Sequence, residues 1–441
     1  MKNMVLTLII LLTCSFYINA QSASADLNNV DLNNIDLNKA VQMTLQNHPS
    51  VKQAQKQIDI VNARISQQKT SYSPEVEADL SYTRIGPVPS FDLPGGISLS
   101  IAPENNYDAR LTYRYNLYDF GRRDAQAEPV SSYRLSAEDN VEVLKSNLAF
   151  QAIQSFYSIL FLRQSLQVKI DQIDNLNRHL DITKARIQSG TATDFDLSST
   201  QVRVAQAENQ RIDIENEIRK QEVNLKNLMG LPSGTPLNLT GSLDYLPVKV
   251  NTDSLLTLAG QQRNELKLAK DAEISAEKQL SAARLSDMPS LGVNLAYGIK
   301  NGFEPNIYTL RGNWAAGVLF RYPIYNGQKS RTLEEEAQAV LESAQAHTND
   351  VELSIKTEIN RAASDVLAAQ NQVLTVRVQV DHARRALQRA ELQYRDGIIS
   401  NMDLLDAQTA LAEARLSQLQ IIYKNVITDF MLKRAIGDKV W

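Results

Sequence analysis

The stretch SPEVEADLSY at residues 73–82 returns in altered form as MPSLGVNLAY at residues 288–297, 215 positions later (288 minus 73). Other equivalent residues, such as Gly190 and Gly397, are 207 positions apart (397 minus 190). A repeat of about 200 residues is far longer than the 20 to 50 residue period of solenoid proteins, so each copy is a substantial structural unit. We infer two similar halves, and the first holds eight extra residues (215 minus 207) after the quoted stretch.

The first residues of the chain predict export. Lys2 is followed by an apolar run and then by Ala20, which is the layout of a secretory signal peptide over residues 1–20. The only cysteine, Cys14, falls inside this segment, so the mature chain needs no disulfide. The alternative is a lipoprotein acylated at Cys14, although Thr13 precedes it where a smaller residue is usual. Residues 21–37 repeat a DLNN motif and are interpreted as a polar tether.

Four segments alternate between apolar and polar residues, a pattern typical of strands with one apolar face and one polar face. They predict two hairpins, at about 75–118 and about 289–322, and the eight extra residues belong to the loop of the first. Each strand has the ~9 to 11 residues that cross a bilayer when tilted. The alternative is a soluble sheet whose apolar face packs on helices. If the strands cross a membrane, we expect charged residues of the polar face to line the lumen, namely Glu77, Asp79, Arg110, Arg114 and Arg321.

Long glycine-poor segments rich in Ala, Gln, Glu and Leu follow each hairpin and predict long helices. Each segment is interrupted once by a turn motif, around Gly190 in the first half and Gly397 in the second. The pattern therefore predicts two helical hairpins, each following a β-hairpin. The predicted boundaries are a first repeat at 38–232 with its helical hairpin at about 122–229, a linker at 233–253, and a second repeat at 254–441 with a small helix at about 254–263 and a helical hairpin at about 329–436.

Beyond the signal segment there is no apolar run of the ~18 residues needed for a membrane-spanning helix, so any membrane span must be β. Four strands cannot close a barrel, and an open sheet edge in hydrocarbon leaves backbone groups unpaired. We therefore expect the chain to oligomerise. Two copies would give a barrel filled by side chains, whereas three or four would leave a channel. The periodicity alone does not choose among these numbers.

The composition gives no sign of catalysis or of nucleic-acid binding. The net charge is −4, and the Lys and Arg residues are scattered rather than clustered. No phosphate-binding glycine loop or nucleophile elbow is present. We expect no enzyme activity, no metal, no cofactor and no nucleic-acid partner. The histidines have no metal-ligand spacing and are each expected to be solvated helix residues: His48, His179, His347 and His382.

The chain resembles the TolC-like outer-membrane efflux protein family. The matching motifs are NHP at 47–49, LYDFGR at 117–122, YPIYNG at 322–327 and the two glycine turns. The resemblance implies an α+β membrane protein with a duplicated β-hairpin and long helical hairpin. It implies a homotrimer whose twelve strands form a β-barrel in the outer membrane, continued by a twelve-helix α-barrel across the periplasm. It also implies the exit duct of a tripartite efflux or secretion system, with a periplasmic adaptor protein and an inner-membrane transporter as partners.

Two other functions remain to be separated from this one. A periplasmic coiled-coil adaptor or scaffold also uses long helical hairpins, but it would lack the four amphipathic strands. An outer-membrane enzyme or specific porin is disfavoured because no catalytic cluster is present and the helices are too long for a plug.

The resemblance also assigns a pore constriction and gate to the helical turns. Asp403 and Asp406 are three apart on one helix, so they share a face and would form two rings of carboxylates in a trimer. Asp196 holds the corresponding place in the first half, and Tyr394 matches a residue that ties neighbouring helices together. The alternative role of the acids is to stabilise helix N-termini. Ile399 stands where some family members have a gating arginine, so closure would need other contacts.

Overall fold

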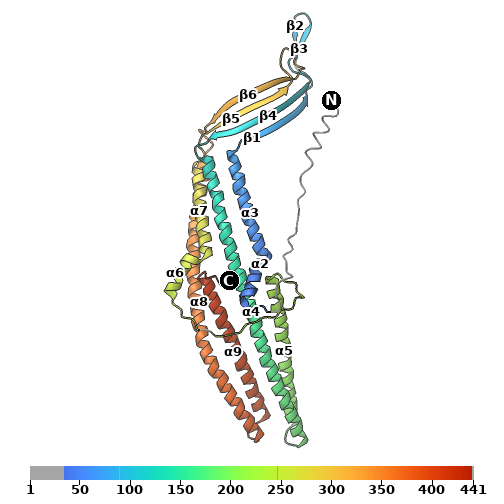
Figure 1. The fold of residues 1–441 in the computed structure, drawn as a ribbon, viewed down its shortest axis with the longest axis vertical. Coiled ribbons are helices and arrows are strands. Elements are labelled where there is room, and N and C mark those ends of the chain that lie inside the picture. The colour runs from blue at the N-terminus through green and yellow to red at the C-terminus, as the bar shows by residue number, and fades with distance from the viewer. Residues whose placement is uncertain (1–33, 89, 246, 440–441) are drawn as a thin grey trace.

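The computed structural model describes residues 34–88, 90–245 and 247–439. The predicted signal peptide at 1–20, with Cys14, and most of the tether at 21–37 lie outside the described residues. The described chain is a long rod of helices with a β-sheet at one end (Figure 1). The predicted α+β fold class, with a β-hairpin and a helical hairpin in each half, is confirmed.

The sheet contains four antiparallel strands in the order β1-β4-β5-β6, so two hairpins lie side by side. A separate small hairpin, β2 with β3, lies in the loop between β1 and β4, where the extra residues of the first half were expected. The free edges of the sheet are β1 and β6. The strand bounds are β1 Glu75–Arg84, β2 Ser90–Leu93, β3 Ile97–Ser100, β4 Asn105–Tyr118, β5 Ser290–Lys300 and β6 Arg311–Arg321.

The register of the sheet keeps the alternation of the sequence in phase across the hairpins. Asp79 lies opposite Arg110, whereas Leu111 lies opposite Tyr297 on the other face. Because successive side chains of a strand point to opposite faces, this register collects the charged residues on one side of the sheet and the large apolar residues on the other. The apolar side chains are exposed, Leu80 at 84% and Trp314 at 77%, so no described element covers that face.

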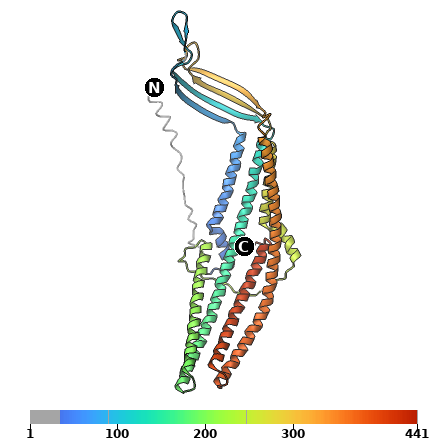
Figure 2. The same cartoon turned by 180° about the vertical axis from the view of Figure 1, so that it is seen from behind.

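Two helices of 67 residues each run the whole length of the rod, about 100 Å at 1.5 Å per residue (Figures 1 and 2). In the half far from the sheet, two helices of 35 residues each return beside them. None of the described helices combines the length and the apolar character that crossing a membrane requires. The bounds are α4 Arg122–Gln188, α5 Asp194–Leu228, α8 Lys329–Arg395 and α9 Asn401–Ala435.

The chain enters each long helix through the same backbone turn. Phe120 and Gly121 both have positive φ (56° and 83°), and the equivalent residues Gly327 and Gln328 also do (68° and 67°). Only glycine adopts this conformation without a steric penalty, and each copy has its glycine at a different one of the two positions. The turn is therefore a shared structural requirement, which the two copies meet with different sequences.

Shorter helices fill the half of the rod near the sheet. Helix α3 packs against α4, and α7 packs between α4 and α8. The sequence prediction ended a small helix near 263, where the extended Arg263 separates α6 from α7, and it assigned no helix to the segment that forms α7. The bounds are α2 Leu37–Asn47, α3 Pro49–Lys69, the 3-10 turn Thr70–Tyr72, α6 Thr252–Gln262 and α7 Asn264–Arg284.

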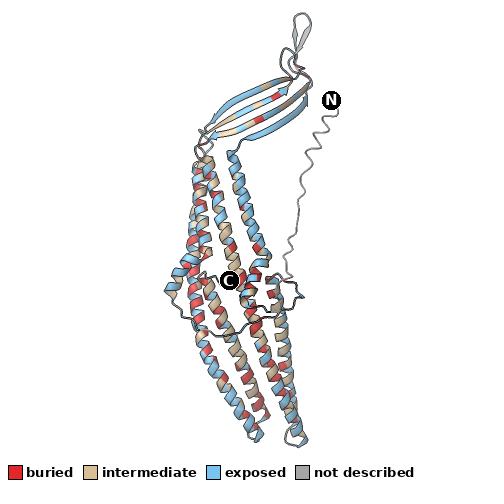
Figure 3. Ribbon diagram, viewed as in Figure 1, coloured by how far each residue is buried: buried red, intermediate tan, exposed pale blue. Residues whose placement is uncertain are grey.

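Two hydrophobic clusters sit at mid-rod, one in each half (Figure 3). In the first, Phe156 and Ile159 of α4 pack with Val41 of α2 and Met229 after α5. Helix α5 ends there because Gly230 (φ 70°) reverses the chain, and Asn47 donates its side-chain Nδ2 to the Met229 carbonyl at 3.2 Å. The cluster therefore fixes the end of α5 against the α2–α3 junction.

We predict that Phe156→Ala lowers the free energy of unfolding by about 3–5 kcal/mol, because Phe156 is fully buried and its removal leaves a cavity. The measurement is denaturant unfolding of the detergent-solubilised protein, followed by helical circular dichroism. Phe91→Ala in the exposed outer hairpin removes the same side chain and should leave the transition in place. Equal shifts in the two variants would contradict the assignment of this core.

Candidate functional site

The ends of the two helical hairpins lie next to each other at the end of the rod farthest from the sheet (Figures 1 and 2). The two turns are built alike. The backbone N–H of Thr191 donates to the Arg186 carbonyl at 2.8 Å, and Ile398 donates to the Gln393 carbonyl at 2.8 Å. In each case the intervening glycine has a φ of 74°, which closes the helix in a C-capping turn. We refer to these turns and the adjoining helix ends as the tip.

Two of the predicted gate acids are capping residues of the returning helices. Asp403 Oδ2 accepts from Ser400 N at 2.9 Å and from Ser400 Oγ at 2.7 Å, and the Ser400 hydroxyl caps α9 in return. Asp196 and Thr193 repeat this capping box at the start of α5. The hydrogen bonds from Ser400 hold the pKa of Asp403 below its ordinary value. Both carboxylates therefore stabilise helix N-termini, which was the alternative role considered for them.

The third acid, Asp406, joins the two hairpins. Its Oδ1 lies 2.9 Å from Arg203 Nη2 of α5, and the Asp406 side chain is 64% exposed. Arg203 did not enter the predicted site, because its partner is distant in sequence. The pair connects α5 of the first half to α9 of the second.

A buried polar network lies behind these acids. His179 of α4 is only 3% exposed, and its Nε2 lies 2.5 Å from Asn401 Oδ1 at the start of α9. Asn401 Nδ2 donates to the Asp196 carbonyl at 3.2 Å and to Thr200 Oγ1 at 3.4 Å. Because its amide group faces those two acceptors, its oxygen faces His179, and His179 must therefore donate from Nε2. The network joins α4, α5 and α9.

Tyr394 contributes the fourth helix of the tip. It is buried, its ring centroid is 5.2 Å from that of His179, and the Arg186 guanidinium carbon lies 4.3 Å from its ring centroid. Arg186 also donates to the Tyr394 carbonyl at 3.3 Å. A cation over an aromatic face is attractive, so α4 and α8 are tied here. Ile399 packs against the buried cluster that contains Tyr394. The guanidinium that lies over the Tyr394 ring comes from Arg186 of the other hairpin.

At the sheet, the predicted lumen residues share one face but fall into separate contacts. Arg114 pairs with Glu77 at 2.9 Å, and Arg110 pairs with Asp108. Arg114 and Arg321 both line a hollow of 770 Å³ where the sheet meets the end of α3. Asp79 lies opposite Arg110 in the register. The face is therefore polar and mixed in charge.

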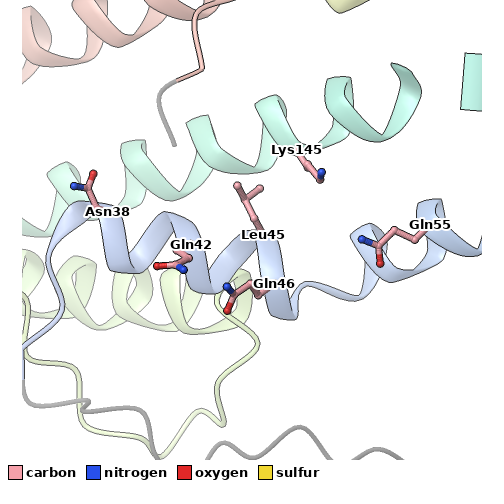
Figure 4. A pocket seen from close by; sticks show the side chains of 6 residues that line it. All are labelled: Asn38, Gln42, Leu45, Gln46, Gln55 and Lys145. Carbon is pink, nitrogen blue, oxygen red and sulfur yellow. The ribbon is translucent and has the colours of Figure 1, made fainter. Parts of the chain in front are cut away.

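Another hollow, of 630 Å³, lies beside the α2–α3 junction against α4 (Figure 4). Its lining side chains are mostly neutral amides, and its single ammonium group, that of Lys145, is paired with Glu142 at 2.7 Å. In the part of the chain that the structure describes, no group of three His, Cys, Asp or Glu could hold a metal ion. The lining residues are Asn38, Gln42, Leu45, Gln46, Gln55 and Lys145.

The sequence model of the outer membrane efflux protein family matches residues 40–231 and 255–438, most of the chain and both halves. The chain belongs to this family. It is an outer-membrane efflux channel whose helices extend into the periplasm, and it is a conduit rather than an enzyme. The alternative of a periplasmic adaptor or scaffold does not agree with this membership.

Individual members of the family are distant in sequence and close in fold. The pyoverdine export outer membrane protein OpmQ of Pseudomonas putida is 24% identical over 349 residues, 77% of this chain and 72% of that protein. The cation efflux system protein CusC of Escherichia coli is 21% identical over 354 residues, 78% and 75% of the two chains. A crystal structure of CusC shares the fold with a TM-score of 0.78 at 17% identity, covering 91% of this chain and 92% of that one. VceC of Vibrio cholerae gives 0.76 at 18% identity, covering 92% and 97%.

In this efflux channel the expectation that every histidine is a solvated helix residue was wrong for His179. Its position follows Ile173 and Leu176 and precedes Thr183, at the three- and four-residue spacing of the buried stripe of α4. A histidine at a position of this stripe could have predicted that its side chain is buried. Asn401, Arg186 and Arg203 carry no comparable signal, since their partners lie on another hairpin.

We predict that the tip loosens in acid through His179. Burial lowers the pKa of His179 below its ordinary 6.5, and the charge of Arg186 lowers it further, while the Asn401 hydrogen bond opposes this. The packed tip therefore disfavours the charged ring, so its stability is full at neutral pH and falls as the pH drops through 6.5 toward the lowered pKa. The measurement is the rate of limited proteolysis at the two turns between about pH 7.5 and about pH 5.5.

Two variants serve as controls for this pH dependence. His179→Gln removes the titrating group and should flatten it, whereas His382→Gln on the exposed face of α8 should leave it intact. An unchanged slope in His179→Gln would show that another group is responsible.

Proposed function

We propose that three copies of this efflux channel form a closed ring that acts as the passive exit duct of a tripartite efflux or secretion system and is gated at the tip. The observation that carries the proposal is the sheet. One face is covered with exposed large apolar side chains, and both edges, β1 and β6, pair with no other strand of the described chain. Water tolerates neither feature well, whereas a bilayer accepts the apolar face once neighbouring copies pair the edges.

The helices support the same ring. In the half of the rod far from the sheet, α5 and α8 lie at opposite edges of the helical array (Figure 1). Helix α5 exposes Phe195, Val202 and Val223, which are separated by multiples of seven residues, and α8 exposes Leu367 and Leu374, which are seven apart. This heptad spacing is typical of the seam of a coiled coil, and no described element of the same chain covers it. Because α5 and α8 are different surfaces, their pairing between copies is head to tail, and such an interface forms a ring when the rotation between copies closes.

Three copies supply twelve strands, which leave an open channel rather than a side-chain core. The number three rests on the family resemblance, since the geometry of one chain does not set it. In this ring the polar sheet face turns inward, so Glu77, Asp79, Arg110, Arg114 and Arg321 line the lumen. The partners are a periplasmic adaptor protein and an inner-membrane transporter. The relatives' names give different cargoes, pyoverdine for one and cations for another, and we propose that the partner pump selects the cargo molecule while the tip affects ion preference.

The tip supports the position of the gate. The described contacts that join the two hairpins of one copy at the tip include His179 with Asn401, Arg186 with Tyr394, and Arg203 with Asp406. These contacts hold the two hairpins of a copy together, and opening must separate or slide them. Asp403 and Asp406 are proposed to face the constriction, with Asp196 beside them.

The ring predicts that a charge on the helical seam prevents assembly. Val202→Glu or Leu374→Glu places a carboxylate in an interface that must be desolvated, so the detergent-solubilised protein should fall from trimer to monomer. Native mass spectrometry measures this. Asn175→Glu, an exposed position on α4, adds the same charge outside the seam and should leave the trimer intact. A trimer in both seam variants would contradict the proposed interface.

The acid gate predicts a change in ion preference. Asp403→Asn combined with Asp406→Asn keeps the side-chain shape and the capping capacity but removes two charges per chain, so cation preference should fall several-fold. Reversal potentials in planar bilayers under a KCl gradient measure it. Asp429→Asn at the other end of α9 is the matched control. Unchanged selectivity in the double variant would refute a gate built from these acids.

A further inference from the structure

We propose that Arg203 is a specificity-determining residue of the duct: it neutralises Asp406 and thereby limits the cation selectivity of the tip. This rests on the proposed function, because it needs the tip to face the permeation path. The geometry is direct, with Arg203 Nη2 at 2.9 Å from Asp406 Oδ1. Among the described residues Arg203 forms no second ion pair, so its charge is committed to Asp406.

The duplication isolates this pair as a difference between the halves. By the offset of 207, Asp406 corresponds to Ser199 and Arg203 corresponds to Ala410. Each half therefore lacks the charge that the other half supplies. The capping acids Asp196 and Asp403, in contrast, are present in both halves and make the same contacts. Both halves need the capping acids for their structure. The Arg203–Asp406 pair is not part of that shared requirement.

The energetics argue against a mainly structural role. Asp406 is 64% exposed and Arg203 is 31% exposed, and ion pairs as exposed as this contribute little to the stability of a fold. The same exposure lets passing ions feel both charges. An ion within a Debye length, about 8–10 Å at 0.1–0.15 M salt, experiences the sum of the two, which is close to zero. Removing one member of the pair therefore changes the field at the tip more than it changes the fold.

The surroundings of Arg203 do not replace its charge. It lines a hollow of 420 Å³ between α4, α5 and α9 together with Lys169, Asp213 and Glu413. Two basic and two acidic side chains line this hollow, so their formal charges cancel. Without Arg203 the hollow has one negative charge in excess, and the carboxylate of Asp406 next to it is no longer paired. In a ring of three copies, three uncompensated Asp406 carboxylates would then join the three Asp403 carboxylates.

The experiment uses the full-length channel in planar bilayers and measures the reversal potential under a KCl gradient. Arg203→Gln should raise the ratio of potassium to chloride permeability about twofold to fivefold near 0.1 M salt, the size expected for one unpaired charge close to the path. The increase should shrink at 1 M KCl, where the Debye length is about 3 Å. Arg203→Lys keeps the charge and should behave as the unmodified protein. Adding Asp406→Asn to Arg203→Gln should cancel the increase.

The matched control is Arg211→Gln on the same helix. Arg211 lies eight residues further along α5, about 12 Å at 1.5 Å per residue, and its ion pairs among the described residues are with Glu208 and Glu215 of its own helix. It removes the same charge and should leave the selectivity unchanged. If the unmodified protein forms no channel at all, the proposed function fails. If it conducts but Arg203→Gln and Arg211→Gln are equally selective, the role of Arg203 is refuted while the duct stands.

Discussion

The backbone groups at the two edges of the sheet impose the constraint on which the rest of the molecule depends. In hydrocarbon there is no water to satisfy unpaired N–H and C=O groups, so a four-stranded sheet with an apolar outer face is stable there only when other copies complete it. Among the described residues, the β1 and β6 edges lack backbone hydrogen-bond partners at one end, and α5 and α8 expose apolar side chains at the other. Both features favour the proposed ring of several copies.

Because the chain is duplicated, each half repeats the same turns and helix ends, which we call its joints. The positive-φ turn into the long helix, the capping box at the tip and the glycine that ends the returning helix all recur at an offset of 207. These joints are set by backbone geometry and hydrogen bonding, which explains why they were kept. The halves diverge where side chains meet another hairpin, at His179, Arg203 and Asp406, and there each hairpin faces a different environment.

Much of the fold was predictable from local patterns. The period-2 alternation fixed the strands and the polar face, since a register slip of one residue would have reversed every side chain. The glycine turns fixed the ends of the helical hairpins. Helix α7 was not predicted, although the end of the preceding helix near Arg263 was. Only the structure shows what holds that break: the Arg263 side chain donates to carbonyl groups at the end of α9, at 3.0 Å to Ala435 O. Such a break depends on a partner that is distant in sequence.

The sequence by itself determined the duplicated order of hairpins, the amphipathic strands and the acids of the tip, because each of these is written in spacing along a single segment. Only the tertiary structure decided what those acids contact. It paired Asp406 with Arg203 and buried His179 against Asn401, whereas the capping contacts of Asp403 and Asp196 are made to residues three positions away on their own segment. The physical reason is that a side chain's charge and hydration depend on neighbours from other segments, and here those neighbours come from the opposite half of the chain.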